Sequence, residues 1–136
     1  MAKAPKALVV LSDPDSRKAV LQILVTCGIA PVFCSTISEG RKSLSSEPAD
    51  VVFCETSFAD GGFEGLLRAL GSAEPCPPEI VCSRLYDPTL YLDLMDRGAF
   101  DFIVYPYHTE EVRWILRSAL LRYSQPAPKR ITALAA

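Results

Sequence analysis

Polar side chains follow several short apolar runs of this sequence, at the positions where those runs end. Asp13 and Asp15 follow the first run, and Glu55 follows a later one. Ser83 and Tyr105 follow two others. Carboxylate oxygens are the ligands that hard cations such as Mg²⁺ prefer, so Asp13 and Asp15 are candidates for a metal site. An aspartate placed like Asp13 is also a typical helix N-cap, and we favour this interpretation, with no bound metal and no catalytic residue.

The sequence lacks the motifs of common cofactor sites. Neither G-x-G-x-x-G nor G-x-x-x-x-G-K-[ST] follows the first apolar run, so binding of a dinucleotide or of a nucleotide by a P-loop is not indicated. The five cysteines form no C-x-x-C pair, and His108 is the single histidine, which leaves no zinc pattern. Because Cys34, Cys54 and Cys82 stand in apolar stretches, we expect buried, reduced thiols and no cofactor.

The composition is that of one ordinary domain. The chain has 136 residues, of which 49% are hydrophobic and 22% charged, far from the composition of a disordered chain. Its formal net charge of −2 argues against a basic nucleic-acid-binding domain. The longest clean apolar run, Ala7–Leu11, is too short to span a membrane, and no secretion signal precedes it. We expect a cytoplasmic protein that binds neither nucleic acid nor membrane.

Two kinds of segment alternate along the chain. The β-rich runs are Ala7–Leu11, Pro31–Cys34, Val51–Cys54, Glu79–Cys82 and Phe102–Val104. The segments with helical spacing are Asp15–Cys27, Ser38–Leu44, Phe63–Leu70, Pro88–Arg97 and a last one over 112–123. Continuous apolar strands are buried on both faces, so the alternation predicts an α/β, doubly wound, five-stranded parallel sheet in a flavodoxin-like three-layer sandwich. Residues 124–136, without periodicity, are expected to be a flexible tail.

Four segments, in order and at matching separations, resemble the receiver domain of two-component response regulators. They are LVVLSDPDSR at 8–17, ADVVFCE at 49–55, PEIVCS at 78–83 and GAFDFIVYPY at 98–107. The last is the most specific, because it is similar to the family pattern G-A-x-x-[FY]-[LIV]-x-K-P-[FY]. The resemblance covers about residues 6–123, and it implies a CheY-like receiver domain over 1–123.

The resemblance also implies that the family's phosphorylation site is degenerate here. The two acids that hold Mg²⁺ in the family fall on Leu11 and Ser12. The phosphoacceptor falls on Glu55, and the lysine that binds the phosphoryl oxygens falls on Tyr105. Only the phosphoryl-binding hydroxyl is kept, as Ser83.

Further positions complete this degenerate pocket by resemblance. The carbonyl that ligates Mg²⁺ falls on Ser57, and the switch aromatic falls on Phe102. Asp13, one place beyond the acidic pair, and Glu55 are the carboxylates left for a metal. Without metal and lysine, nothing neutralises the charge on a transferring phosphoryl group, so we interpret the chain as a pseudo-receiver.

Glu55 has two interpretations. Its side chain is longer than aspartate and carries its charge nearer to where a phosphoryl group would sit, so it could imitate the phosphorylated state. Alternatively, it is an inert carboxylate that is hydrogen-bonded to Ser83 or Tyr105. Loss of the lysine favours the inert carboxylate. Because Tyr105 takes the place of the lysine, we expect its hydroxyl to bind Glu55 directly or through one water.

Three apolar residues predict a contact surface. Trp114 and Leu121 lie opposite the apolar stripe of the last helix, and Leu92 on the preceding helix joins them. Receivers commonly dimerise or bind partners through this face. We therefore expect either a protein partner, such as a signalling kinase or regulator, or a homodimer through the last helix.

The sequence thus predicts a non-enzymatic signalling module of a two-component phosphorelay, acting through protein–protein contacts without phosphotransfer. Two alternatives stay open. One is a functional receiver that accepts phosphate at an atypical site, which Mg²⁺ binding would reveal. The other is a small flavodoxin-like ligand binder, for which residues 12–15, with the sequence SDPD, make a poor phosphate-binding loop.

Overall fold

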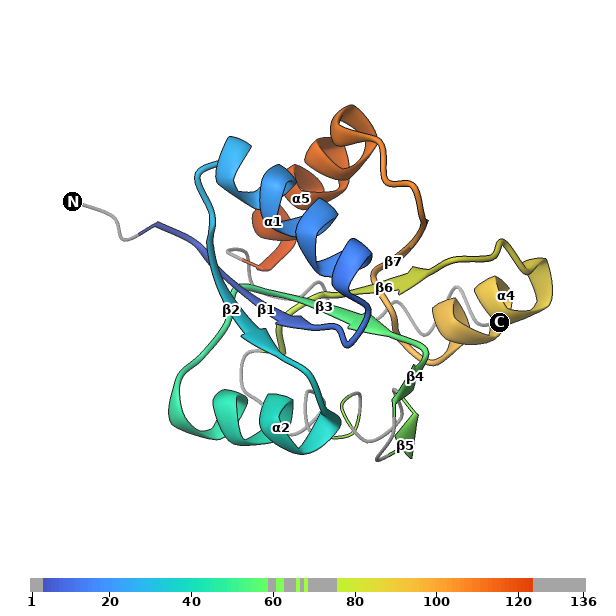
Figure 1. Ribbon diagram of the computed structural model, residues 1–136, viewed down its shortest axis with the longest axis horizontal. Helices are drawn as coiled ribbons and strands as arrows, with labels where there is room; N and C mark the ends of the chain where they lie inside the picture. The colour runs from blue at the N-terminus through green and yellow to red at the C-terminus, as the bar shows by residue number, and fades with distance from the viewer. Residues whose placement is uncertain (1–3, 59–60, 63–65, 67, 69–75, 124–136) are drawn as a thin grey trace, which may run out of the picture.

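A parallel sheet forms the centre of the molecule in the computed structural model, which describes residues 4–58, 61, 62, 66, 68 and 76–123 (Figure 1). Its five strands, in spatial order, are β2 (Ala30–Cys34), β1 (Lys6–Val10), β3 (Val51–Glu55), β6 (Glu79–Ser83) and β7 (Asp101–Val104). All neighbouring strands run parallel. The predicted doubly wound fold is therefore confirmed. A short antiparallel hairpin of β4 (Ser57–Phe58) and β5 (Gly61–Gly62), which the sequence does not predict, follows β3.

Helices cover both faces of this sheet. Helices α1 (Pro14–Thr26) and α5 (Thr109–Tyr123) pack on one face, and α2 (Ile37–Ser46) and α4 (Pro88–Asp96) pack on the other (Figure 1). The predicted helix Phe63–Leu70 lies outside the described residues except for Leu66 and Arg68, which are helical. The predicted tail over 124–136 also lies outside them. No helix in the described part of the chain is long and apolar enough to cross a membrane.

Strand β1 shows how the sequence divides the core. Ala7 and Val9 pack in the cluster beneath α1 and α5, whereas Leu8 and Val10 pack in the cluster beneath α2 and α4. Successive side chains of a strand point to opposite faces, so a continuous apolar run is buried on both sides. Each such Val or Leu contributes roughly 1.5–3 kcal/mol by leaving water.

Local residues set where the helices begin and end. Asp13 caps α1 and Asp87 caps α4, each followed by a proline in the first turn. Gly28 and Gly98, which follow these helices, adopt positive φ angles of 72° and 105°, a conformation that glycine takes without a steric cost. These signals set where the chain leaves each helix and enters the next strand, and so they fix the sheet edge on which the site lies.

Candidate functional site

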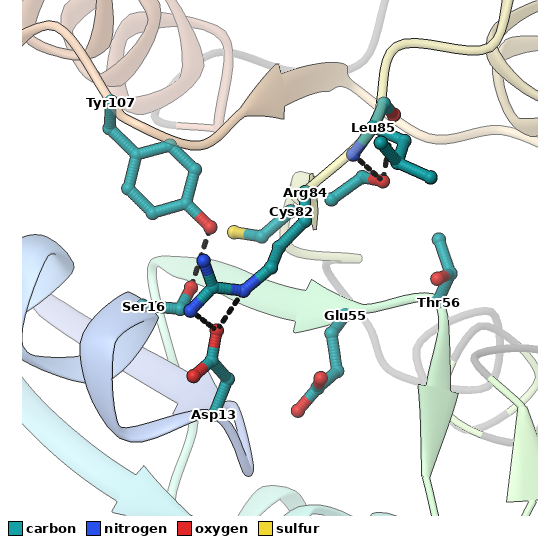
Figure 2. Close-up of a pocket in the computed structure, with 9 residues that line it drawn as sticks. Asp13, Ser16, Glu55, Thr56, Cys82, Arg84, Leu85 and Tyr107 are labelled. Carbon is teal, nitrogen blue, oxygen red and sulfur yellow. Dashed lines mark hydrogen bonds and ion pairs between the residues drawn. The ribbon is translucent and has the colours of Figure 1, made fainter.

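The carboxyl ends of the central strands surround a hollow of about 280 Å³. The α1 N-terminus, the segment after β3, the β6–α4 loop and the segment after β7 all contribute to its wall (Figure 2). Its lining residues are Asp13, Ser16, Glu55, Thr56, Cys82, Ser83, Arg84, Leu85 and Tyr107. This is the edge at which open α/β sheets bind their ligands.

Arg84 binds two carboxylates at the mouth of this hollow. Its Nε donates to Asp13 Oδ2 at 2.8 Å, and its Nη2 lies 2.6 Å from the same oxygen. Nη2 also donates to Asp15 Oδ2 at 3.2 Å. Desolvation lowers the pKa of Arg84, but the hydrogen bonds and charges of Asp13 and Asp15 outweigh this effect and raise the pKa above its ordinary value. The β6–α4 loop is therefore tied to the start of α1 by an ion pair.

Asp13 has a second bond that fixes its orientation. Its Oδ1 accepts from the backbone N–H of Asp15 at 3.3 Å and caps α1, as predicted. One oxygen thus caps the helix while the other binds Arg84. A negative side chain is favourable at a helix N-terminus, where backbone N–H groups lack partners.

Glu55 points toward the β1–α1 loop. Its Oε1 accepts from the backbone N–H of Ser12 and from the Ser12 hydroxyl, the latter at 2.7 Å. Among the described residues Glu55 makes no direct hydrogen bond to Ser83 or to Tyr105, so the direct bonds are not found, and a bond to Tyr105 through one water stays a prediction. The carboxylate instead joins the ends of β1 and β3, which are neighbours in the sheet.

Ser83 is bonded within its own loop. Its hydroxyl donates to the carbonyl of Leu85 at 2.9 Å and accepts from the backbone N–H of Leu85 at 3.2 Å. These bonds tighten the turn that leads from β6 to α4, and they also set the position of the neighbouring Arg84. The side chain still lines the hollow.

Tyr107 closes the opposite wall of the hollow. Its hydroxyl lies 2.5 Å from the Ser16 hydroxyl, and Figure 2 shows the thiol of Cys82 beside it. Burial raises the pKa of the Tyr107 phenol above its ordinary value. Burial also raises the pKa of the Cys82 thiol to about 12, so this cysteine is a neutral, unreactive group at neutral pH.

Four described residues assigned to the pocket by the sequence do not line this hollow, and one of them is Ser12, which instead binds Glu55. Leu11 is fully buried in the core beneath α1 and α5, because it continues the apolar alternation of β1. Phe102 is buried on the other face, edge-on to Tyr91 at 6.0 Å between ring centroids. Tyr105, joined to Pro106 by a cis peptide bond, lines a different hollow. Ser57 begins β4, and its side chain lies outside the described part of the structure.

Sequence reasoning missed Arg84 and Tyr107 as site residues. Arg84 lies two places after the fourth apolar run, Glu79–Cys82, so its place at a strand end was a usable signal. Its partner Asp13 lies 71 residues earlier, and only the folded sheet brings the two together. Tyr107 stands two places beyond Tyr105. The two rings meet edge-on at 5.4 Å, but only Tyr107 turns into the hollow.

Comparisons with known proteins agree on one family, although no protein-family model matches the chain. The chain is 29% identical over 115 residues to the "Probable transcriptional regulatory protein y4xI" of Sinorhizobium fredii, covering 85% of this chain and 51% of that protein. It is 24% identical over 115 residues to the response regulator protein PilR of Pseudomonas aeruginosa, covering 85% of this chain and 26% of that one. The chain therefore spans about half the length of y4xI and about a quarter of PilR.

Solved structures show the same fold. A two-component response regulator from Clostridium difficile superposes with a TM-score of 0.78 at 19% identity, over 89% of this chain and 99% of that one. A signal receiver domain from Vibrio parahaemolyticus superposes with a TM-score of 0.81 at 15% identity, over 90% of this chain and 94% of that one. The chain is similar in sequence to these response regulators and has the fold of a receiver domain.

The residues of this domain do not fit the Mg²⁺ that the resemblance to receiver domains implies. Mg²⁺ needs several oxygen ligands in nearly octahedral geometry. Asp13 and Asp15 already hold the guanidinium of Arg84, and Glu55 is bonded to Ser12. Within the described ranges, no cluster of three or more His, Cys, Asp or Glu side chains could hold a metal ion. The hollow thus carries a fixed protein cation among its carboxylates.

Proposed function

We propose that this receiver domain signals through protein contacts without accepting a phosphoryl group on Glu55. The observation that carries the proposal is the ion pair of Arg84 with Asp13 and Asp15. Transfer of a phosphoryl group requires cations that stabilise the charge developing on its oxygens. Arg84 is the one cationic side chain among the described residues that line the hollow, and its two carboxylate partners offset its charge.

The positions of Leu11 and Tyr105 support the same proposal. Leu11 stands where the family has a metal-binding acid, and it is buried in the core. Tyr105 stands where the family has its lysine, and its ring lies beneath the guanidinium of Arg84 at 4.5 Å, outside the wall of the hollow. Neither residue supplies charge to the site. Glu55, held by Ser12, acts in this proposal as an inert structural carboxylate.

The apolar side chains of α4 and α5 supply the contact surface in this proposal. Leu92, Trp114 and Leu121 are 66%, 68% and 58% exposed. Burial of the exposed Trp114 indole by a partner would contribute part of the roughly 2–3 kcal/mol that full burial supplies. We propose that a protein partner of a two-component pathway, or a second copy of the chain, covers these residues. The similarity to y4xI, a probable transcriptional regulatory protein, and to PilR, a response regulator, supports that context.

The proposal is tested by incubating the full chain with acetyl phosphate and Mg²⁺ and measuring its intact mass. We expect no phosphate adduct, because the site offers neither free metal ligands nor an unpaired cation. The Glu55→Ala variant is the matched control, since it distinguishes an adduct on Glu55 from modification elsewhere. An adduct that forms on the parent chain and is lost in Glu55→Ala would overturn the proposal.

A further inference from the structure

A second hollow, of about 410 Å³, lies where α4, β7 and the start of α5 meet. Its wall consists largely of aromatic rings. The side chains that matter for the argument are Tyr86, Tyr91, Phe102, Tyr105, His108 and Glu111. This hollow is separate from the strand-end hollow, since the described residues that line the two differ throughout.

The aromatic rings give this hollow an electronegative lining. The faces of tyrosine and phenylalanine rings attract cations, and the attraction grows when several rings converge. Tyr91 and Phe102 pack edge to face, with an interplanar angle of 79°. Tyr86 is 65% exposed, so its ring is open to a partner.

The charge on the wall has one sign. Glu111 is the one carboxylate among the described lining residues, and no lysine or arginine lines the hollow with it. Its neighbour Glu110 pairs with Arg113 at 3.8 Å, whereas Glu111 makes no ion pair within the described ranges. The hollow therefore combines an unpaired carboxylate with aromatic faces, which is the environment that a cationic group prefers.

Aromatic rings of this domain already contact guanidinium groups of its own arginines. The guanidinium of Arg84 lies over the Tyr105 ring at 4.5 Å, and that of Arg17 lies over the Phe33 ring at 5.1 Å. A guanidinium is planar, stacks on aromatic faces and can bind a carboxylate through two N–H groups at once, which an ammonium cannot do. Arg84 itself is held by Asp13 and Asp15 and does not line the second hollow.

We propose that the second hollow binds an arginine side chain of a protein partner, stacked on its tyrosine rings and bonded to Glu111. This inference rests on the proposed function in one respect only, that the domain acts by protein contact. The partner would present an arginine to the second hollow, which lies on the same helices, α4 and α5, as the exposed apolar residues.

The test is a titration of the full chain with N-acetyl-arginine amide, followed by NMR. The matched ligand is N-acetyl-citrulline amide, which keeps the planar shape and loses the charge. We expect saturable shifts at Tyr86, His108 and Glu111, with the citrulline amide binding about tenfold more weakly. Absence of saturable shifts, or equal binding of the two amides, would overturn the proposal.

Variants then locate the site. Glu111→Gln should weaken binding of the arginine amide about threefold. Tyr86→Leu should weaken it about fivefold. Glu110→Gln, one residue away but paired with Arg113, is the matched control and should bind like the parent. Equal affinities of the parent and Glu111→Gln would contradict the proposed site, provided that the amide spectra show both chains folded.

Two further outcomes would assign the hollow to another occupant and thereby overturn the proposal. Lys129 and Arg130 are the basic residues of the segment 124–136. If the double variant Lys129→Ala/Arg130→Ala binds the arginine amide and the parent chain does not, the chain's own C-terminal segment fills the hollow. If sedimentation shows a dimer that Glu111→Gln dissociates, a second copy fills it. A phosphate adduct on Glu55 would refute the proposed function and leave this titration unaffected, so the two failures are distinguishable.

Discussion

Arg84 Nε donates to Asp13 Oδ2 at 2.8 Å, across 71 positions of the sequence. The bond joins the loop after β6 to the first turn of α1, and Asp15 binds the same guanidinium. Two loops that border the strand-end hollow are thus held together by charge (Figure 2). The predictions below concern this ion pair, the Glu55 carboxylate, a buried carboxylate in the sheet and the surface of α5.

Removal of the Arg84 charge should lower the melting temperature, and the loss should be larger at low salt than at high salt. In Arg84→Gln, Asp13, Asp15 and Glu55 are left without a cation, and salt screens their mutual repulsion. We therefore expect Arg84→Gln to melt below the parent at low salt, with a difference that narrows as salt is added. Arg113→Gln, which loses only an exposed pair with Glu110, is the control. If the difference in melting temperature between the parent and Arg84→Gln does not depend on salt, the ion pair does not hold the β6–α4 loop to the start of α1.

Loss of the Glu55 carboxylate should cost stability rather than alter signalling. Glu55→Ala removes the acceptor for both the N–H and the hydroxyl of Ser12, and we expect a loss of about 1 kcal/mol in the free energy of unfolding. Ser12→Ala, which leaves the backbone bond in place, should lose less. Urea unfolding measures both values. A Glu55→Ala chain as stable as the parent would mean that this bond contributes nothing.

Glu79 should make the domain less stable as the pH rises through neutrality. It is 2% exposed, and neither carboxylate oxygen has a hydrogen-bond partner in the described part of the chain. Burial raises the pKa of Glu79 to about 8 from an ordinary value of 4.5. Between these two values the folded state binds more protons than the unfolded state, so the stability present below pH 4.5 is lost as the pH rises toward 8.

The size of this effect can be measured with one substitution. Each unit of pKa shift corresponds to about 1.4 kcal/mol, so the loss for Glu79 is roughly 3–5 kcal/mol between pH 4.5 and 8. Glu79→Leu should remove this pH dependence and be more stable than the parent at pH 8, because it buries no charge. If urea unfolding shows the same pH profile for the parent and Glu79→Leu, the carboxylate does not titrate as we expect.

Trp114 should matter for association and not for folding. Its side chain is 68% exposed, so Trp114→Ala should change the free energy of unfolding by less than about 0.5 kcal/mol. It should also shift a self-associating sample toward monomer, or abolish capture of a partner. Ile115→Ala, at a buried neighbouring position, is the control and should cost about 2–5 kcal/mol. Unfolding of Trp114→Ala would show that the indole belongs to the core.

The sequence predicts the fold well where a single physical signal is sufficient. The apolar runs give the five parallel strands within a residue or two, since continuous burial on both faces leaves a continuous apolar pattern. Asp13 is found at the predicted cap of α1 because capping depends on a few adjacent residues. The β4–β5 hairpin is too short for any periodicity to indicate it.

The site is predicted less well, because its contacts join residues that are far apart in the sequence. Family resemblance indicates which strand ends meet, but not which side chains bond. Glu55 binds Ser12 instead of Tyr105, since Tyr105 turns away to the second hollow. Leu11 belongs to the core, because its place in the β1 alternation outweighs its place in a family motif. Burial of the Glu79 carboxyl group also has no local signal in the sequence.

The most direct test of the central claim is an NMR titration of the parent chain with Mg²⁺ and beryllofluoride, a mimic of a bound phosphoryl group. The amides of Ser12, Glu55 and Ser83 report on the hollow. The account predicts no saturable shift at these amides, because Arg84 binds Asp13 and Asp15 and no lysine is among the described residues that line the hollow. Saturable shifts centred on Glu55 and Ser83 would contradict it and would establish a receiver that still binds phosphoryl groups.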